Sequence, residues 1–553
     1  MKIKNLVLLI LFYSTFIFPQ VETVPADHPV YPFLKRLQVE GILKSYNDIV
    51  LPKSKEEVQN YLLQIDSCKN LLSESDREYL ATMFNHLGLS KKSMLIFDDF
   101  PNKLWENIIY NKERHLYNYS DSVINFSVDP VFEYKFIHSN KYKANASLLN
   151  LGGRIFGSYN GWLGFYLQGS NGIVFNNRNV AEFDPRVKES YTFNKTDINF
   201  FDGTSGYIRL KEGIVSLQMG RERILWGQSY INRMVLSDNP QLFDFVRFNL
   251  AYKTLTYNFI HGWLVQPPTV NYVDSLFTNI KSKNSKYIAL SRLGYTPSDN
   301  LSLGISQFVI YSNRPFEAAY LNPFLFWESA QRSMNDLDNS FLALDGRYLV
   351  TNGMEISGNI VFDDIKFDVL AKGNFANISN RSAWQIGIML TNPVLFNNSD
   401  FKIEYVQIRP YVFSHPGVGE SLTYTNNGNL LGINLQPNST RFSLQFDYMF
   451  SGKIYSSILW NHTLHGNNVY DSNDNLVKNY GGSVFYDYNV HSQIITPLLS
   501  GNLEKDDQVQ LNFLYEISFG YYMGFNYTFQ RSIIKNDISF NNYFWGTFKL
   551  DFE

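Results

Sequence analysis

The sequence contains a single cysteine, Cys68, in 553 residues. One cysteine cannot form an intramolecular disulfide, and Cys68 lies too far along the chain to be the lipid-modified first residue of a lipoprotein. Beyond the first 20 residues, no segment has the roughly 18 uninterrupted apolar residues that a membrane-spanning helix needs. A disulfide scaffold, a lipoprotein and a helical membrane protein are therefore excluded.

Signatures of catalysis are also missing. The sequence has no His-Glu-x-x-His motif, no P-loop and no Gly-x-Ser-x-Gly motif. His462 and His465 are three residues apart, a spacing that puts them on opposite faces of a strand, where they cannot share a metal ion. We therefore expect no enzyme activity, no cofactor and no metal site. A barrel enzyme acting on lipid or peptide is the least favoured alternative.

Aromatic residues, in contrast, are abundant. The 37 Tyr, 45 Phe and 8 Trp make up 16% of the chain. A transmembrane β-barrel needs such residues, because it carries aromatic girdles at both membrane interfaces and an apolar outer band that contacts outer-membrane lipid. Lys and Arg (48) nearly balance Asp and Glu (51), and the resulting net charge of −3 argues against a nucleic-acid partner.

Residues 1–20 have the features of a signal peptide. Lys2 and Lys4 supply the positive start, and an apolar run over 6–18 follows and ends at Pro19. The run is too short to cross a bilayer as a helix, so we expect export and cleavage. An uncleaved N-terminal anchor is the alternative.

Residues 21–115 are expected to form a small helical segment on the periplasmic side of the barrel or inside it as a plug. Apolar residues recur at helical spacing over 30–43, 54–65 and 73–87. Ser54 with Glu57 forms a potential capping box, and Ser73 is a potential N-cap. Because such short helices are marginal alone, their apolar faces must pack on each other or on the barrel.

From about residue 116 to residue 553 the apolar period changes from 3.6 to 2, which predicts an all-β transmembrane antiparallel barrel. Roughly 430 residues, at about 22 to 26 per strand and connection, allow about 16 to 20 strands, and we expect 18. Pro130 interrupts the first apolar alternation. Hairpins are expected within 250–259 and between 207–210 and 215–219, 287–295 and 301–310, 355–362 and 366–375, 383–390 and 402–411, and 430–435 and 441–450. Regular blade repeats, which a soluble propeller would show, are not found.

The last strand alternates in the same way. Phe544, Phe548 and Phe552 fall on one face, and Trp545 and Lys549 fall on the other. A terminal strand of this kind is what outer-membrane proteins present to the barrel-assembly machinery, a partner expected during biogenesis. We therefore expect the protein in the bacterial cell outer membrane.

Two segments combine charged and aromatic side chains at high density, and either could line the lumen. Planar Arg side chains beside carboxylates and an indole can recognise a charged sugar, or they can form an ion-pair network that stiffens the barrel. Both interpretations stay open. The candidate residues of the first segment are Arg221, Arg223, Trp226 and Asp238; those of the second are Arg314, Glu317, Asp338 and Asn339.

The same segments carry a family resemblance. The motifs are Gly220-Arg221, Ile224, Trp226-Gly227 and Leu236-Ser237-Asp238-Asn239, then Glu317, Tyr320-Leu321-Asn322-Pro323 and Asp338-Asn339. Together with residues 24–31 near the N-terminus, they resemble the capsule-assembly Wzi family of outer-membrane proteins. The resemblance implies an 18-stranded barrel with an N-terminal helical plug. It also implies a surface lectin that attaches capsular polysaccharide to the cell, without catalysis.

A capsular or surface polysaccharide is thus the expected partner, and a diffusion channel for sugars or other small solutes is the alternative function. The N-terminal helices favour a plugged barrel over an open pore. Long loops over 176–200 and 267–286 are expected to close the outer mouth. Their aromatic residues would offer sugar rings apolar faces for stacking: Tyr191, Phe193, Phe200, Tyr272 and Phe277.

Overall fold

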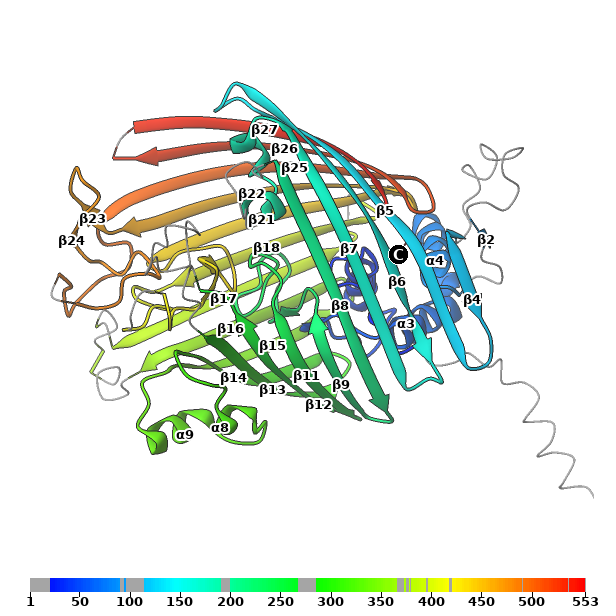
Figure 1. The fold of residues 1–553 in the computed structure, drawn as a ribbon, viewed down its shortest axis with the longest axis horizontal. Helices are drawn as coiled ribbons and strands as arrows, with labels where there is room; N and C mark the ends of the chain where they lie inside the picture. Colours follow the sequence, from blue (N-terminus) through cyan, green and yellow to red (C-terminus); the bar gives the residue numbers. More distant parts are fainter. Residues whose placement is uncertain are drawn as a thin grey trace, which may run out of the picture.

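The body of the protein is a closed antiparallel β-barrel of 18 strands, as expected from the sequence (Figure 1). The structure is a computed structural model that describes residues 20–89, 94–95, 114–189, 199–266, 285–365, 372–373, 377, 379–393, 396–416, 420–489, 491–535 and 537–552. The barrel strands are β5 (Ile124–Ser139), β6 (Ala144–Tyr159), β7 (Leu163–Asn176), β8 (Phe200–Glu212), β9 (Val215–Arg221), β11 (Asp244–Tyr252), β12 (Leu255–Leu264), β13 (Lys286–Ser298), β14 (Leu301–Ser312), β15 (Asn339–Thr351), β16 (Met354–Ile365), β17 (Asn380–Thr391), β18 (Ser399–Ile408), β21 (Ser439–Ser451), β22 (Ile454–Asn467), β25 (Asn502–Ser518), β26 (Tyr521–Ile534) and β27 (Asp537–Leu550). The predicted signal peptide lies outside the described residues, apart from Gln20.

The barrel closes where the last strand meets the first. β27 pairs with β5 from Phe132 to Ser139, and the short strand β4 (Tyr117–Ser120) pairs with the same edge of β5 from Asn125 to Val128. Pro130 falls between these two pairings, where its missing N–H costs no ladder hydrogen bond. Pro130 interrupts the apolar alternation of the sequence, but β5 runs through this residue without a break.

The two ends of the barrel have different connections. At one end, turns of two residues join successive strands, as at 213–214, 253–254, 299–300 and 352–353. At the other end the connections are long, at 222–243, 409–438 and 468–501. Short periplasmic turns and long extracellular loops are the layout of outer-membrane barrels. We call the two ends the periplasmic end and the outer end.

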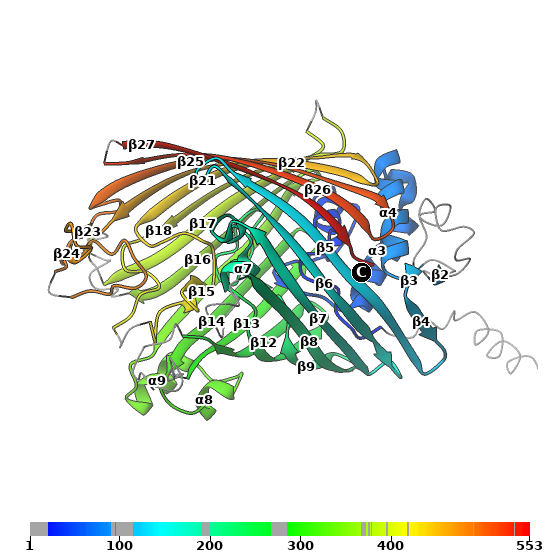
Figure 2. The same cartoon turned by 45° about the horizontal axis from the view of Figure 1, so that its top comes forward.

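Three helices fill the periplasmic end (Figure 2). They are α2 (Val30–Val39), α3 (Lys55–Ser67) and α4 (Glu74–His86), with a 3-10 turn η1 (Lys69–Leu71) between the last two. Ser54 and Glu57 form the predicted capping box of α3, and Ser73 caps α4. Their apolar faces share one core, which includes Leu34, Leu62 and Leu80. We call residues 20–89 the plug. No helix among the described residues is long and apolar enough to cross a membrane.

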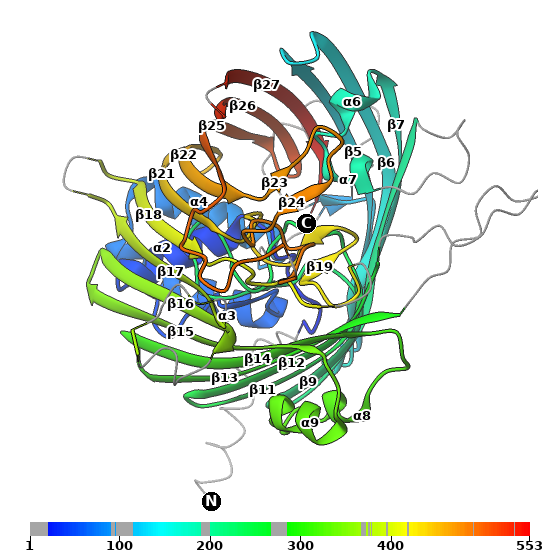
Figure 3. The ribbon, with the colours of Figure 1, turned by 90° about the vertical axis from the view of Figure 1, so that its left-hand side faces the viewer.

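Long connections from the outer end fold back into the lumen and meet the plug there. The plug strand β1 (Val50–Leu51) pairs with β10 (Leu225–Trp226), which belongs to connection 222–243. An apolar core surrounds this pair and includes Trp226, Met234 and Leu431, all almost fully buried. Connection 409–438 adds the hairpin of β19 (Thr425–Asn426) and β20 (Asn429–Leu430), and connection 468–501 adds β23 (Val469–Tyr470) and β24 (Leu476–Lys478). Viewed along the barrel, these segments and the plug lie inside the ring of strands (Figure 3).

Most predicted hairpins are present, but two are wrong. Residues 355–362 lie in β16, whose partners are β15 and β17, and most of 366–375 lies outside the described residues. Residues 430–435 do not pair with 441–450, because β21 pairs with β18 and β22. Leu431 and Ile433 instead pack in the lumen core. An apolar alternation identifies a half-buried segment, and a loop folded onto such a core can satisfy the same pattern.

Side chains alternate between the lumen and an apolar outer surface. Leu167, Ile208 and Met219 point outward and are 55%, 58% and 66% exposed. On β27, Trp545 and Lys549 line cavities in the lumen, as the alternation of the last strand predicts. An outer wall of exposed apolar residues around a polar interior is typical of a barrel that spans a membrane.

The plug is joined to the wall through buried charges that centre on Glu355 of β16. The Glu355 carboxylate is fully buried and lies 2.5 Å from Lys35 Nζ and 3.0 Å from an Arg347 nitrogen. Gln38 Nε2 donates to it at 2.8 Å, and the Tyr230 hydroxyl of connection 222–243 donates at 2.9 Å. One carboxylate therefore ties together the plug, the wall and an inward connection.

We expect Glu355→Gln to destabilise the docked plug, because Lys35 and Arg347 would lose their buried counter-charge. The cost should be about 3 kcal/mol. The measurements are the free energy of unfolding in urea and the rate of protease cleavage within residues 20–89. Asp66→Asn is the control, since Asp66 pairs with Lys69 on the exposed surface of the plug. Equal effects of the two substitutions would contradict this role for Glu355.

Candidate functional site

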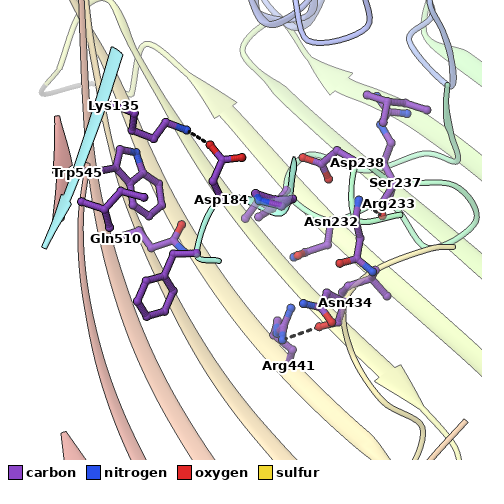
Figure 4. A pocket seen from close by; sticks show the side chains of 17 residues that line it. Lys135, Asp184, Asn232, Arg233, Ser237, Asp238, Asn434, Arg441, Gln510 and Trp545 are labelled. Atoms are coloured by element: carbon purple, nitrogen blue, oxygen red, sulfur yellow. Dashed lines mark hydrogen bonds and ion pairs between the residues drawn. The ribbon is translucent and has the colours of Figure 1, made fainter. Parts of the chain in front are cut away.

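A cavity of about 650 Å³ opens in the outer half of the lumen. Barrel strands form one wall, with Lys135 of β5, Gln510 of β25 and Trp545 of β27 (Figure 4). Inward connections form the facing wall, with Asn232, Arg233, Ser237, Asp238 and Asn434. We call this space the outer cavity. It lies beside the closure of the barrel, because Trp545 and Ile137 are register partners across β27 and β5.

The strand wall of the outer cavity is aromatic because residues 177–189, which follow β7, fold inward. Their two short helices, α6 (Arg178–Ala181) and α7 (Pro185–Glu189), pack Val180 and Val187 against Phe201 and Ile137 on the inner face of the barrel. This packing stacks Phe183 on Tyr543, with ring centroids 4.6 Å apart, and Tyr543 lies 5.7 Å from Trp545. Phe183 and Trp545 both line the cavity.

Charged residues beside this aromatic wall are paired. Asp184 lies 2.7 Å from Lys135 Nζ and 2.7 Å from Arg186, and Arg186 also contacts Glu133. Burial disfavours ionised Asp184, but Arg186 and Lys135 outweigh it and hold the pKa of Asp184 well below its usual range. Lys135 also lies 5.9 Å from the centroid of a Trp545 ring. The strand wall therefore presents the Trp545 ring to the cavity, next to charged side chains that ion pairs hold in place.

The facing wall is held in shape by hydrogen bonds to backbone. The Ser237 hydroxyl donates to the carbonyl of Gly432 at 2.7 Å, and Asn239 Nδ2 donates to that of Leu430 at 2.7 Å. Arg441 donates to the carbonyl of Asn434 at 3.2 Å. In contrast, the side chains of Asp238, Asn434 and Gln510 make no hydrogen bond to any other residue that the structure describes. Those three groups are available to a ligand.

A second cavity of about 630 Å³ lies toward the periplasmic end and reaches Thr23 and Asp27 of the plug. It shares Lys135, Asp184 and Pro185 with the outer cavity, so the Lys135–Asp184 ion pair stands between the two spaces. Its other polar residues are mostly charged: Glu133, Arg154, Arg186, Asp202, Arg221, Glu222, Arg223, Lys549 and Asp551.

The four candidate residues of the first segment lie at the lumen but do not form one network. Arg221 makes a bidentate ion pair with Asp244 at 2.8 and 2.9 Å. Arg223 donates to the carbonyls of Asp238 and Pro240, both at 2.7 Å, and so shapes connection 222–243. Trp226 is buried in the core around β10. Among these four residues, Asp238 lines the outer cavity.

The four candidates of the second segment lie elsewhere. Arg314 pairs with Asp338 at 2.5 Å, and the Tyr320 hydroxyl donates to the same carboxylate at 2.6 Å. The Glu317 backbone N–H donates to the Tyr311 hydroxyl. This cluster supports α8 (Ala318–Leu321) and α9 (Trp327–Met334), which lie outside the barrel (Figure 3). Asn339, the first residue of β15, donates a hydrogen bond from its side chain to the carbonyl of Leu422. The structure therefore separates the two segments that the sequence grouped together.

Other expectations for loop residues have mixed outcomes. Tyr191, Phe193, Tyr272 and Phe277 lie outside the described residues, and Phe200 is 54% exposed at the start of β8. His462 contacts Asp507 at 2.8 Å while His465 contacts Ser439, on the opposite face of β22, as their spacing predicts. No group of three or more possible metal ligands occurs among the described residues.

The two arginine pairs should differ in their effect on stability. Arg314→Ala removes the ion-pair partner of the buried Asp338 carboxylate, so it should lower the free energy of unfolding by about 1 to 3 kcal/mol. Arg221→Ala breaks a pair whose side chains are 44% and 58% exposed, so it should change stability by no more than about 0.5 kcal/mol. Urea unfolding of both variants measures the difference. Equal losses would be inconsistent with the separate environments of the two pairs.

Comparisons with known proteins identify the fold. No family model matches the sequence, and no curated protein matches it. The structure is similar to that of Wzi, an outer-membrane protein involved in group 1 capsule assembly in Escherichia coli and described as a carbohydrate-binding β-barrel. The TM-score is 0.55 at 11% identity, covering 95% of this chain and 99% of Wzi. OprD of Pseudomonas aeruginosa follows with a TM-score of 0.43 at 12% identity, covering 78% and 96%. OpdK of the same organism, solved with vanillate, has a TM-score of 0.44 at 11% identity, covering 77% and 98%. The resemblance to the Wzi family is thus confirmed at the level of the fold.

Proposed function

We propose that this chain is an outer-membrane protein that binds a capsular or other surface polysaccharide in its outer cavity and holds it at the cell surface during capsule assembly. The observation that carries the proposal is the way in which the lumen is filled. The plug and the inward connections pair through β1 and β10, and they leave an aromatic and polar cavity in the outer half of the barrel.

The chemistry of the outer cavity suits a sugar. The faces of pyranose rings carry C–H groups that pack against aromatic rings, and Trp545 and Phe183 supply such rings. Asp238, Asn434 and Gln510 can exchange hydrogen bonds with sugar hydroxyls, because the polar atoms of their side chains have no other described partner.

A polymer suits this site better than a free monosaccharide. A single sugar unit makes few contacts, so its affinity for one cavity is low. Successive units of one polymer raise the effective concentration at the site, and many copies of the protein can hold one polymer at once. The similarity to Wzi, described as carbohydrate-binding, supports the same interpretation.

The remaining parts of the proposal concern delivery to the membrane. Residues 1–20 direct export as a signal peptide, and the barrel-assembly machinery recognises the aromatic alternation of the last strand. The apolar outer wall, with Leu167, Ile208 and Met219, then lies against outer-membrane lipid. No step in this proposal requires catalysis or a cofactor.

We expect Trp545→Ala and Gln510→Ala each to weaken binding of purified surface polysaccharide by about tenfold, or about 1.4 kcal/mol. The loss follows from removing a stacking face in one variant and a hydrogen-bonding amide in the other. Binding of the protein in detergent to immobilised polysaccharide measures the effect. Trp162→Ala is the control, since Trp162 is an exposed tryptophan in the turn between β6 and β7, remote from the cavity. No binding by the wild-type protein would remove the proposal.

The alternative function, a diffusion channel, predicts a different conductance in planar bilayers. A lumen filled by the plug and the inward connections should give little or no steady conductance, and cells lacking the protein should shed capsule into the medium. Large steady conductance together with normal capsule retention would favour the channel instead.

A further inference from the structure

The connection between β14 and β15, residues 313–338, packs on the outside of the barrel rather than over its mouth (Figure 3). It covers outward-facing side chains of β12 to β14. Phe259, Val309 and Tyr311 of the wall form one buried cluster with Tyr320 and Trp327 of the connection. Phe324 stacks on Tyr257, with ring centroids 5.5 Å apart.

This contact lies well down the wall of the barrel. Gln307, which bonds the connection, is the register partner of Ser291, and Ser291 is four residues from Tyr295 near the periplasmic end of β13. Four residues of a strand span roughly 13 Å, about half of the roughly 25 Å apolar band of such barrels. Leu293 and Ile305, exposed outward-facing neighbours below Gln307, belong to the same wall. The connection therefore reaches the level at which the rest of the wall faces lipid.

Side chains of the wall satisfy three backbone groups of the connection, as a lipid environment requires of such groups. Gln307 Nε2 donates to the carbonyl of Leu325 at 2.7 Å, and its Oε1 accepts the N–H of Trp327 at 3.1 Å. The Tyr257 hydroxyl donates to the carbonyl of Pro323. Gln307 and Tyr257 are polar residues at outward positions, and these bonds to backbone groups of the connection explain their presence there.

The face of the connection that points away from the wall carries large apolar side chains beside exposed polar residues, among them Arg332 of α9. Phe324 and Leu337 are 78% and 80% exposed, and three further exposed side chains accompany them: Phe316, Leu321 and Phe326. Five of its six charged residues pair among themselves, Arg314 with Asp336 and Asp338 and Arg332 with Glu328. The exposed apolar side chains continue the outer surface of the barrel instead of forming an isolated patch.

We propose that residues 313–338 form a lipid-embedded collar, with one face packed on β12 to β14 and the exposed apolar side chains in contact with acyl chains of the outer leaflet. The collar widens the apolar surface on one side of the barrel and anchors it in the membrane. It does so independently of any ligand in the lumen.

Site-directed spin labelling tests this, because Cys68 is the only native cysteine. In a Cys68→Ser background, Phe324→Cys and Leu337→Cys each carry one nitroxide in phosphatidylcholine vesicles. Met219→Cys, on the outward face of β9, is the lipid-facing control, and Leu71→Cys, 71% exposed in the plug, is the water-facing control. The readout is collision of each label with oxygen, which partitions into acyl chains, and with a water-soluble nickel complex.

The collar predicts that labels at 324 and 337 match the label at 219, with high oxygen and low nickel accessibility. Nickel accessibility equal to that at 71 would overturn the proposal and leave the segment in water. Dipolar broadening between labels on different molecules would also overturn it, since a second copy of the chain would then cover this face. Unchanged heat-modifiable migration on gels establishes that each variant is folded.

Discussion

The plug, the barrel wall and an inward connection meet at one buried carboxylate. Glu355 is inaccessible to solvent, and its partners come from the plug (Lys35 and Gln38), the adjacent strand (Arg347) and an inward connection (Tyr230). A buried charge is tolerated only when it is fully paired, so these three parts must be in place together. The shape of the outer cavity depends on the same contacts, because the connection that contributes Tyr230 also contributes Asn232 and Asp238 to the cavity wall.

The parts of the fold that depend on local interactions could be predicted from the sequence. The helices carry their own caps, with Ser54 and Glu57 at α3 and Ser73 at α4, and hairpins with two-residue turns pair strands that are adjacent in sequence. Chain length limited the strand number to about 16 to 20, because the spacing of strands in such barrels is regular. The hairpin predicted for residues 430–435 was wrong because their apolar side chains pack on the lumen core. An alternation of apolar residues does not distinguish packing on that core from contact with a membrane.

The candidate site could not be predicted in the same way. Lys135, Asp184 and Trp545 come together because β27 closes on β5 and residues 177–189 fold inward, and neither event leaves a local pattern. We chose two candidate segments for their high density of charged and aromatic residues. That density does not indicate whether a segment lies inside or outside the barrel wall. Of the eight candidates, Asp238 reaches the outer cavity, while Arg314, Glu317 and Asp338 support the collar outside the barrel.

A filled lumen supports the proposed binding function over the alternative diffusion channel on energetic grounds. Opening a path would separate β1 from β10, expose the core around Trp226 and remove Tyr230 from Glu355. Losing the hydrogen bond from Tyr230 to the buried Glu355 carboxylate costs about 1 to 3 kcal/mol, which reduces an open population by a factor of about 5 to 150. The same rigidity lowers the entropic cost of binding, since Trp545 and the facing polar wall are already in position. Under the proposed function, this preformed cavity would gain affinity for a sugar from the interactions that hold the plug and the inward connections in place.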